Sequence, residues 1–182
     1  EWTSDVSLWN ASGRPVMVHL EYLPEKTNNS AAGITSPEIH IAAFESLTLE
    51  DVVLDRFGID NGKGTLLIEA SGSVTVTSRV ATAGPNGGTS GNGVRTFHDG
   101  TWWKTQALLP GVRLRDGFRT NVGFVSGAEA ITVRCKLFNA EGTLVAEGSV
   151  NVEPRSMRQL SVERIFGFSG YTVPDPVGAI TV

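Results

Sequence analysis

The chain has 182 residues and a net charge of −4, with 40% hydrophobic and 19% charged residues. This length suits one large domain or two small ones that bury roughly 70% of the unfolded surface, so the core needs no disulfide. The charges are of mixed sign without a basic run, which argues against nucleic acid as a partner, and no apolar stretch approaches the roughly 20 residues of a membrane span.

Two passes through one pattern of elements organise the sequence. The first pass has a short apolar strand at 6–9 and an alternating strand at 16–23, and the second repeats them at 122–125 and 131–138. Apolar residues occupy every second position of both alternating strands, which is typical of a strand with one buried face. The matching positions predict two related halves.

Each pass closes with a strand that leads into a short helix. The helices end at the Phe-Gly pairs 57–58 and 166–167, where glycine fits the positive φ of a helix C-cap. Thr48 and Asp51 have the spacing of an N-terminal cap for the first helix. We therefore predict an all-β fold, a β-sandwich built from two related halves with two short helical turns.

The predicted boundaries are 1–80 for the first half, 81–112 for a connecting insertion and 113–182 for the second half. The insertion is rich in glycine and also holds two tryptophans. A long irregular insertion in a compact domain is usually functional or disordered, and the flanks of this one are too apolar for disorder alone. We expect it to pack across the sheets and to join the two halves.

The second half is incomplete by comparison with the first. Two strands follow the first helix, at 65–70 and 74–80, whereas only the short segments 171–173 and 178–182 follow the second. Either the last strand lies beyond a truncated end, or the fold leaves an open edge, which is a template for another strand. A homo-oligomer joined through the C-terminal strand is therefore one hypothesis, and a shortened chain is its rival.

Residues 118–125 read Phe-Arg-Thr-Asn-Val-Gly-Phe-Val and resemble the "FRTNVG" signature of a group of secreted bacterial β-sandwich proteins of unknown function. The "DVV…FG" and "SR" elements of that group have counterparts at 51–53, 57–58 and 78–79. The resemblance implies that the two halves are Ig-like and that the protein is secreted or lies on a bacterial cell surface. It implies no catalytic residues.

Two adjacent tryptophans are the strongest candidates for ligand binding. Trp102 and Trp103 lie in the insertion, and flat aromatic faces stack on sugar rings and anchor protein partners. Neighbouring residues of a strand face opposite ways, so we expect one tryptophan to be buried and the other exposed. His98 and Asp99 precede them and suit acid–base chemistry, although a turn at 99–100 is the alternative interpretation.

Sequence motifs for catalysis or metal binding are missing. The chain lacks a Gly-x-Ser-x-Gly elbow, an HExxH motif, a CxxC pair and a P-loop, so we predict no catalytic residue, no metal and no cofactor. Arg79 and Arg119 flank the insertion and are assigned structural roles, because an arginine fork ties loop carbonyls or a carboxylate together. Cys135 lies on the apolar face of its strand and is predicted to be a buried thiol.

These features favour a non-catalytic exported module. We predict that it binds a polysaccharide or a protein surface, or that it supports a larger assembly, without nucleic acid or a membrane span. Two alternatives stay open: a subunit that assembles by strand exchange at its C-terminal edge, and a hydrolase whose site lies on the 81–112 insertion.

Overall fold

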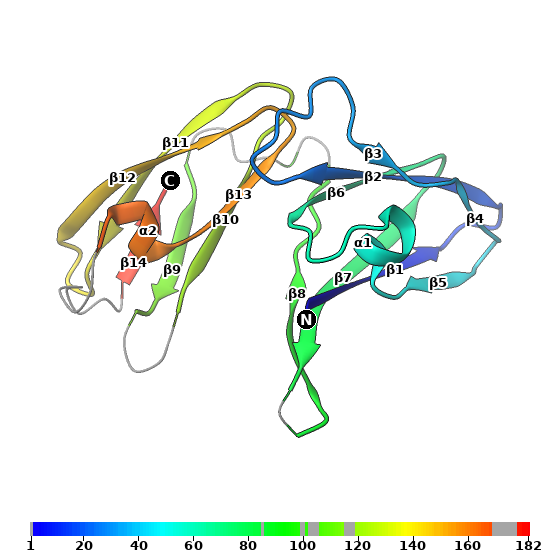
Figure 1. Ribbon diagram of the computed structural model, residues 1–182, viewed down its shortest axis with the longest axis horizontal. Coiled ribbons are helices and arrows are strands. Elements are labelled where there is room, and N and C mark those ends of the chain that lie inside the picture. Colours follow the sequence, from blue (N-terminus) through cyan, green and yellow to red (C-terminus); the bar gives the residue numbers. More distant parts are fainter. Residues whose placement is uncertain (1, 85, 99–100, 102–105, 115–118, 169–177) are drawn as a thin grey trace. The chain divides into compact units, whose positions relative to one another are not determined.

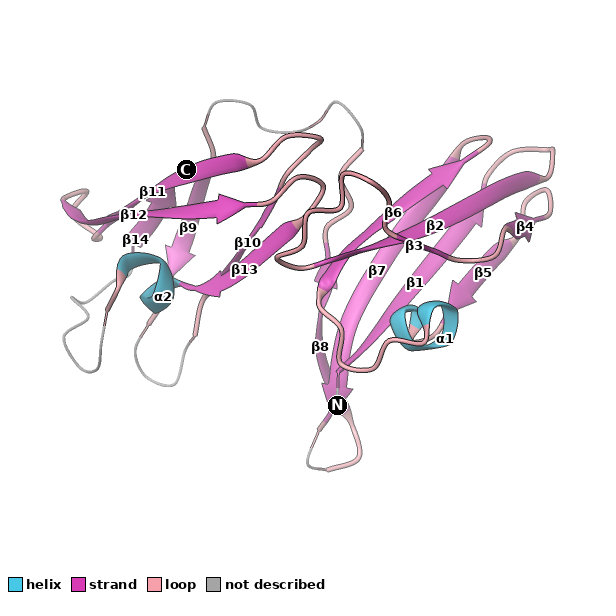
Figure 2. Cartoon of the chain, turned by 45° about the horizontal axis from the view of Figure 1, so that its top comes forward, coloured by secondary structure: helices cyan, strands magenta, loops and turns pink. Residues whose placement is uncertain are grey.

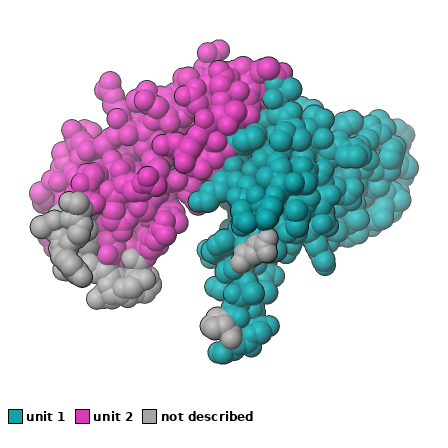
Figure 3. All heavy atoms as spheres, viewed as in Figure 1, with its two compact units in different colours: residues 1–24, 32–101 teal, residues 25–31, 102–182 magenta. Residues whose placement is uncertain are grey.

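The computed structural model describes residues 2–84, 86–98, 101, 106–114, 119–168 and 178–182 (Figure 1). Strands dominate the chain and the two helices are short, which confirms the prediction of an all-β sandwich fold. The chain divides into two compact units, unit 1 with residues 1–24 and 32–101 and unit 2 with residues 25–31 and 102–182 (Figure 3).

Unit 1 contains two antiparallel sheets and one helix (Figures 1 and 2). Its elements are β1 (Trp2–Asn10), β2 (Val16–Pro24), β3 (Ile34–Thr35), β4 (Ile39–Ile41), β5 (Ser46–Leu49), α1 (Val52–Phe57), β6 (Gly64–Ala70), β7 (Val74–Ala83) and β8 (Thr89–Val94). One sheet has the order β5-β1-β7-β8, and in the other β2 pairs with β3, β4 and β6. Alternate residues of β1 and β2 point into one hydrophobic cluster, in which Leu8 and Leu20 are fully buried.

The described residues of unit 2 also form two antiparallel sheets and one helix. Its elements are β9 (Leu108–Val112), β10 (Asn121–Val125), β11 (Ile131–Phe138), β12 (Leu144–Val152), β13 (Met157–Ser161), α2 (Val162–Phe166) and β14 (Gly178–Thr181). One sheet has the order β12-β11-β14-β9, and the other consists of β10 and β13. Phe124, Leu137 and Ile180 meet in the core of this unit.

Segment 25–31 packs in unit 2 although it directly follows β2 in the sequence. The Lys26 N–H donates to the Met157 carbonyl at 3.3 Å, and the Asn29 N–H donates to the Pro154 carbonyl at 3.1 Å. Unit 2 is therefore built from two separate stretches of the chain.

Both units follow one plan of strand pairing. β1 pairs with β5 in unit 1, and β10 pairs with β13 in unit 2. The central strand of unit 1, β2, lies between β4 and β6. The central strand of unit 2, β11, lies between β12 and β14. Val16 lies opposite Ile41 in unit 1, and Ile131 lies opposite Val152 in unit 2. This agreement supports the interpretation of two related halves.

The helix ends confirm one prediction and correct another. Gly58 and Gly167 close the two helices with φ of 65° and 70°, as the Phe-Gly pairs predict. The predicted N-terminal cap of α1 is wrong, because Thr48 lies in β5, where its hydroxyl is 3.0 Å from that of Ser7. Asp51 holds the N-cap position without a capping hydrogen bond from its side chain.

The predicted insertion at 81–112 is divided between the two units. β7 continues to Ala83 and pairs with β8 in unit 1, whereas β9 pairs with β14 in unit 2. The described part of the insertion therefore lengthens one sheet in each unit.

Candidate functional site

The most distinctive feature of unit 2 is the edge of β10 that faces away from β13. β10 pairs with β13 along its whole length, from Asn121 opposite Ser161 to Val125 opposite Met157. Within the described parts of the chain, no strand pairs with the other edge of β10. β10 carries no charged residue and no proline, which are the usual protections of an exposed edge.

Two backbone hydrogen bonds at the ends of this pair show which way its peptide groups point. The Val162 N–H donates to the Thr120 carbonyl and the Ser126 N–H donates to the Ser156 carbonyl, each at 3.0 Å. Bonded and non-bonded pairs alternate along an antiparallel ladder, so the even-numbered residues of β10 bond to β13. The odd-numbered residues direct their N–H and C=O groups to the other side. We call these groups, on Asn121, Gly123 and Val125, the free edge of β10.

β1, the counterpart of β10 in unit 1, is paired on both sides. The Asn10 N–H donates to the Glu45 carbonyl at 3.0 Å, so the even-numbered residues of β1 bond to β5. Its odd-numbered residues bond to β7, with Ser7 opposite Thr77. The free edge of β10 is therefore the edge that β7 covers in unit 1.

The core side chains of β10 are slightly more exposed than their counterparts in β1. Val122 and Phe124 point into the core and are each 8% exposed, compared with 4% for Val6 and 0% for Leu8 in β1. Gly123 lies between them, and a Cβ added there would meet no atom within 4 Å. This Cβ would point to the outer face of the sheet, away from the core, so the outer face is open at the middle residue of β10.

Arg119 holds the start of β10. Its Nε donates to the Asn121 Oδ1 at 3.1 Å, within the segment that carries the "FRTNVG" pattern. The other predicted structural arginine, Arg79, lies in β7 and donates to the Thr89 hydroxyl of β8. Both contacts join two side chains, and in these hydrogen bonds neither arginine binds a loop carbonyl or a carboxylate, the partners that the sequence-based assignment expected.

The sequence-based hypothesis placed the open edge at residues 178–182. In the structure β14 occupies this segment and is paired on both sides, with β11 and with β9. Ile180 of β14 is fully buried. The free edge is at β10 instead, because β9, from the predicted insertion, covers the outer side of β14.

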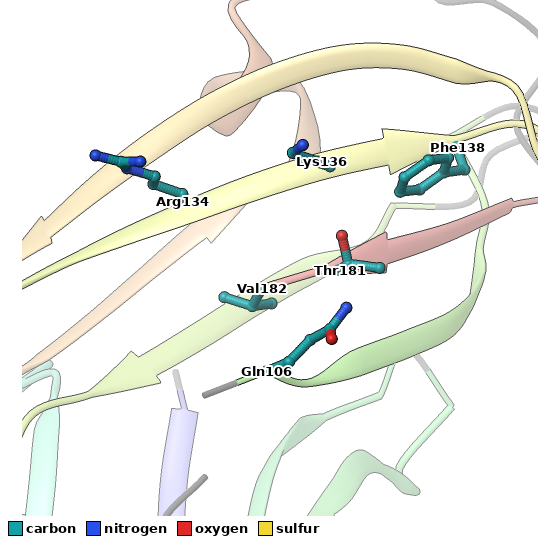
Figure 4. Close-up of a pocket in the computed structure, with 6 residues that line it drawn as sticks. All are labelled: Gln106, Arg134, Lys136, Phe138, Thr181 and Val182. Atoms are coloured by element: carbon teal, nitrogen blue, oxygen red, sulfur yellow. The ribbon is translucent and has the colours of Figure 1, made fainter. Parts of the chain in front are cut away.

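A second candidate is a shallow depression of about 430 Å³ on the outer face of β11. Arg134, Lys136 and Phe138 follow one another along the strand at alternate positions, so they share this face (Figure 4). The remaining lining residues are Gln106, Thr181 and Val182. The Lys136 Nζ is also 3.3 Å from the Glu147 Oε1, and both side chains are largely exposed, so solvent screens this ion pair.

The predicted ligand-binding residues fall mostly outside the described residues. Trp102, Trp103 and Asp99 lie there, and His98 is exposed. The His98 carbonyl accepts hydrogen bonds from the Thr101 N–H at 3.1 Å and from the Thr101 hydroxyl at 2.7 Å. The hydrolase alternative gains no geometric support from these bonds.

Cys135 lies in the core of unit 2 and is 1% exposed. Burial raises the pKa of its thiol, because desolvation disfavours the thiolate. A neutral buried thiol is a poor nucleophile, so Cys135 acts here as a small hydrophobic residue.

Two histidines meet one carboxylate on the exposed face of β2 and β4. The Nε2 atoms of His19 and His40 lie 3.1 Å and 2.9 Å from the Glu38 carboxylate oxygens. All three side chains have access to solvent. No group of three or more His, Cys, Asp or Glu side chains among the described residues is arranged to hold a metal ion.

Comparison with protein-family models, with curated proteins and with solved structures finds no match to this chain. The resemblance to the "FRTNVG" group therefore stays a prediction. None of the helices in the described residues is long and apolar enough to cross a membrane.

Proposed function

We propose that this chain is a non-catalytic binding module that holds an extended segment of another polypeptide at the free edge of β10. The observation that carries the proposal is the contrast between β1, paired on both sides, and β10, paired on one. Each residue of the free edge offers one backbone donor and one acceptor. In strand addition these groups supply affinity, and alternate side chains supply specificity. Secretion or display on a bacterial surface, as the resemblance implies, is part of this proposal.

A peptide-display selection against the intact chain tests the proposal. Peptides that bind the chain should lose at least tenfold in affinity for Gly123→Pro, because proline removes the outward N–H and its ring fills the edge. The fold should persist, because this N–H takes no part in the ladder with β13.

Gly123→Ala is the matched control for this experiment. It adds a Cβ that meets no atom within 4 Å and keeps the N–H, so the selected peptides should still bind. A selection that yields no binders, or binders that do not distinguish Gly123→Pro from the wild-type chain, would refute the proposal.

The depression on β11 favours a second candidate function, the binding of an acidic polysaccharide. Arg134 and Lys136 offer cationic donors, and the Phe138 ring offers a flat apolar face next to them. Gel electrophoresis through immobilised polygalacturonate should show retarded migration that Arg134→Ala and Phe138→Ala each abolish. Gly123→Pro should leave this retardation unchanged. Equal migration in gels with and without the polymer would exclude this function.

A further inference from the structure

We infer that the segment held at the free edge of β10 runs antiparallel to it and carries the side-chain pattern of β7. This inference rests on the proposed function and specifies the partner. The partner is an extended polypeptide segment with small or β-branched residues, mainly apolar, at alternate positions and polar residues between them.

Unit 1 provides the template for this inference. β7 runs antiparallel to β1, with Val76 opposite Leu8 and Ser78 opposite Val6. Side chains at the even positions of β7 from 74 to 80 are half-buried, whereas Thr75, Thr77 and Arg79 are exposed. The alternation matches a strand that covers a core with one face and meets solvent with the other.

Two equivalent hydrogen bonds, one in each unit, align the residues of β10 with those of β1. The bond from Asn10 to Glu45 at the end of β1 has its counterpart in the bond from Ser126 to Ser156 at the end of β10. Counting back from these residues, Phe124 corresponds to Leu8.

The same count pairs Val122 with Val6 of unit 1. A partner residue opposite Phe124 therefore has the role of Val76, and one opposite Val122 has the role of Ser78. Both partner side chains would flank core residues of β10 that are still 8% exposed.

A flexible segment of another polypeptide suits this edge better than a second folded copy. β7 is held between β1 and β8 within its own sheet. Among the described strands none pairs with the outer edge of β8, but its sequence Thr-Ser-Gly-Asn-Gly-Val has one apolar side chain and no alternation. The apolar side chains of a folded copy are already packed in its own core, whereas an unfolded segment can place its own beside Val122 and Phe124.

A synthetic peptide with the sequence of residues 74–83, Val-Thr-Val-Thr-Ser-Arg-Val-Ala-Thr-Ala, is the probe. It is added to the intact chain, and binding is measured by fluorescence anisotropy. A control peptide has the same ten residues in an order that breaks the alternation. We expect the control to bind at least tenfold more weakly, and we expect Gly123→Pro to weaken binding of the first peptide by at least tenfold.

Amide exchange followed by NMR locates the bound peptide. The amides of Gly123 and Val125 should gain protection, while the amide of Ser7 should keep the protection that β7 already gives it. Protection lost at Ser7 would show that the peptide replaces β7 in unit 1, which would overturn the inference.

The direction of the peptide is tested by photo-crosslinking. A reactive group at the first residue of the peptide should crosslink near Ser126, since Val74 lies opposite Asn10 in unit 1. A group at the arginine of the peptide should crosslink near Asn121, since Arg79 lies opposite Asp5. The reverse pattern would show parallel addition and would overturn the inference.

Other outcomes separate this inference from the proposed function. If display-selected peptides without the alternation bind at the free edge and Gly123→Pro abolishes their binding, the proposed function stands and the inference fails. If the chain self-associates with protection at Gly123 and takes up no peptide, the occupant is a second copy, and the inference also fails. If the two ten-residue peptides bind equally, the alternation is irrelevant and the inference is overturned.

Discussion

Units 1 and 2 share a pairing plan, yet they place their unpaired edges differently. In unit 1 the sheet that contains β1 continues through β7 to β8, while in the opposite sheet no described strand lies beyond β6. In the described part of unit 2 the sheet that contains β10 ends at this strand, and the opposite sheet continues from β14 to β9. Related sequences can thus produce related cores and different edges, because a strand added from outside the repeat decides which edge is covered.

The largest expected effect on stability concerns β14, which β9 covers, and its counterpart β6, which lies at the edge of its sheet. Ile180 of β14 lies opposite Leu137, and Leu66 of β6 lies opposite Tyr22. Leu137 and Tyr22 hold equivalent positions in β11 and β2, so Ile180 corresponds to Leu66. Ile180 is fully buried with β9 beside it, whereas Leu66 is half-buried at an edge. Ile180→Ala should therefore lower the free energy of unfolding by about 2–5 kcal/mol, and Leu66→Ala by less.

Urea denaturation, with labelling of the Cys135 thiol as a probe of unit 2, measures this difference. Ile180→Ala should make Cys135 reactive at lower urea, whereas Leu66→Ala should leave the labelling curve in place. If both variants shift the curve equally, β9 does not stabilise β14 in the way described here.

A pair of proline substitutions tests whether β1 and β10 differ in their edges. Ser7→Pro removes an N–H that bonds to β7 and leaves a carbonyl of β7 unpaired, so unit 1 should lose at least about 1–3 kcal/mol. Gly123→Pro, at the corresponding position, removes an N–H that has no strand partner among the described residues and should change the stability of unit 2 by less than about 1 kcal/mol. Thermal unfolding followed by circular dichroism gives both values. A loss at Gly123→Pro as large as that at Ser7→Pro would mean that the edge of β10 is already occupied.

A third prediction concerns segment 25–31, which packs in unit 2. Asn29 is 3% exposed, and its amide donates to the Thr27 and Arg155 carbonyls at 3.0 Å and 2.9 Å. Asn29→Ala leaves these acceptors without their donor, so unit 2 should lose about 1–3 kcal/mol. Earlier labelling of Cys135 in urea is the expected result. Asn28→Ala is the control: it removes only an exposed hydrogen bond, in which the Asn28 Oδ1 accepts from the Ser30 N–H, and should shift the labelling much less than Asn29→Ala.

Local patterns in the sequence were enough to predict the sandwich fold and the C-terminal ends of the two helices. The alternation in β2 and β11 places Leu20 and Cys135 in the cores, and the glycines at 58 and 167 end the two helices. Both features depend on neighbours in sequence, where periodicity and backbone conformation act directly.

The free edge could not be located in this way, because it depends on pairing between distant strands. The segment at 178–182 looks like an unpaired terminal strand until β9, about 70 residues earlier, is known to pair with it. Asn29 gives no sign in its polar surroundings that its partner is Arg155. The repeat did contain one usable signal, since β10 matches β1 and no described strand of unit 2 matches β7.

The smallest expected effect separates the two units by pH. Burial raises the pKa of Cys135, which lies in unit 2 and is the single cysteine of the chain. Below the ordinary pKa of a thiol, about 8.5, the folded and unfolded states both hold the proton and stability is unaffected. As the pH rises above that value the unfolded state releases the proton while the folded state retains it, so unit 2 loses stability. The loss approaches about 1.4 kcal/mol for each pH unit until the folded thiol itself ionises.

Urea denaturation at pH 7 and pH 10 should therefore show a larger drop in the free energy of unfolding for the wild-type chain than for Cys135→Ala. Equal drops in the two proteins would show that the thiol is accessible to water in the folded unit.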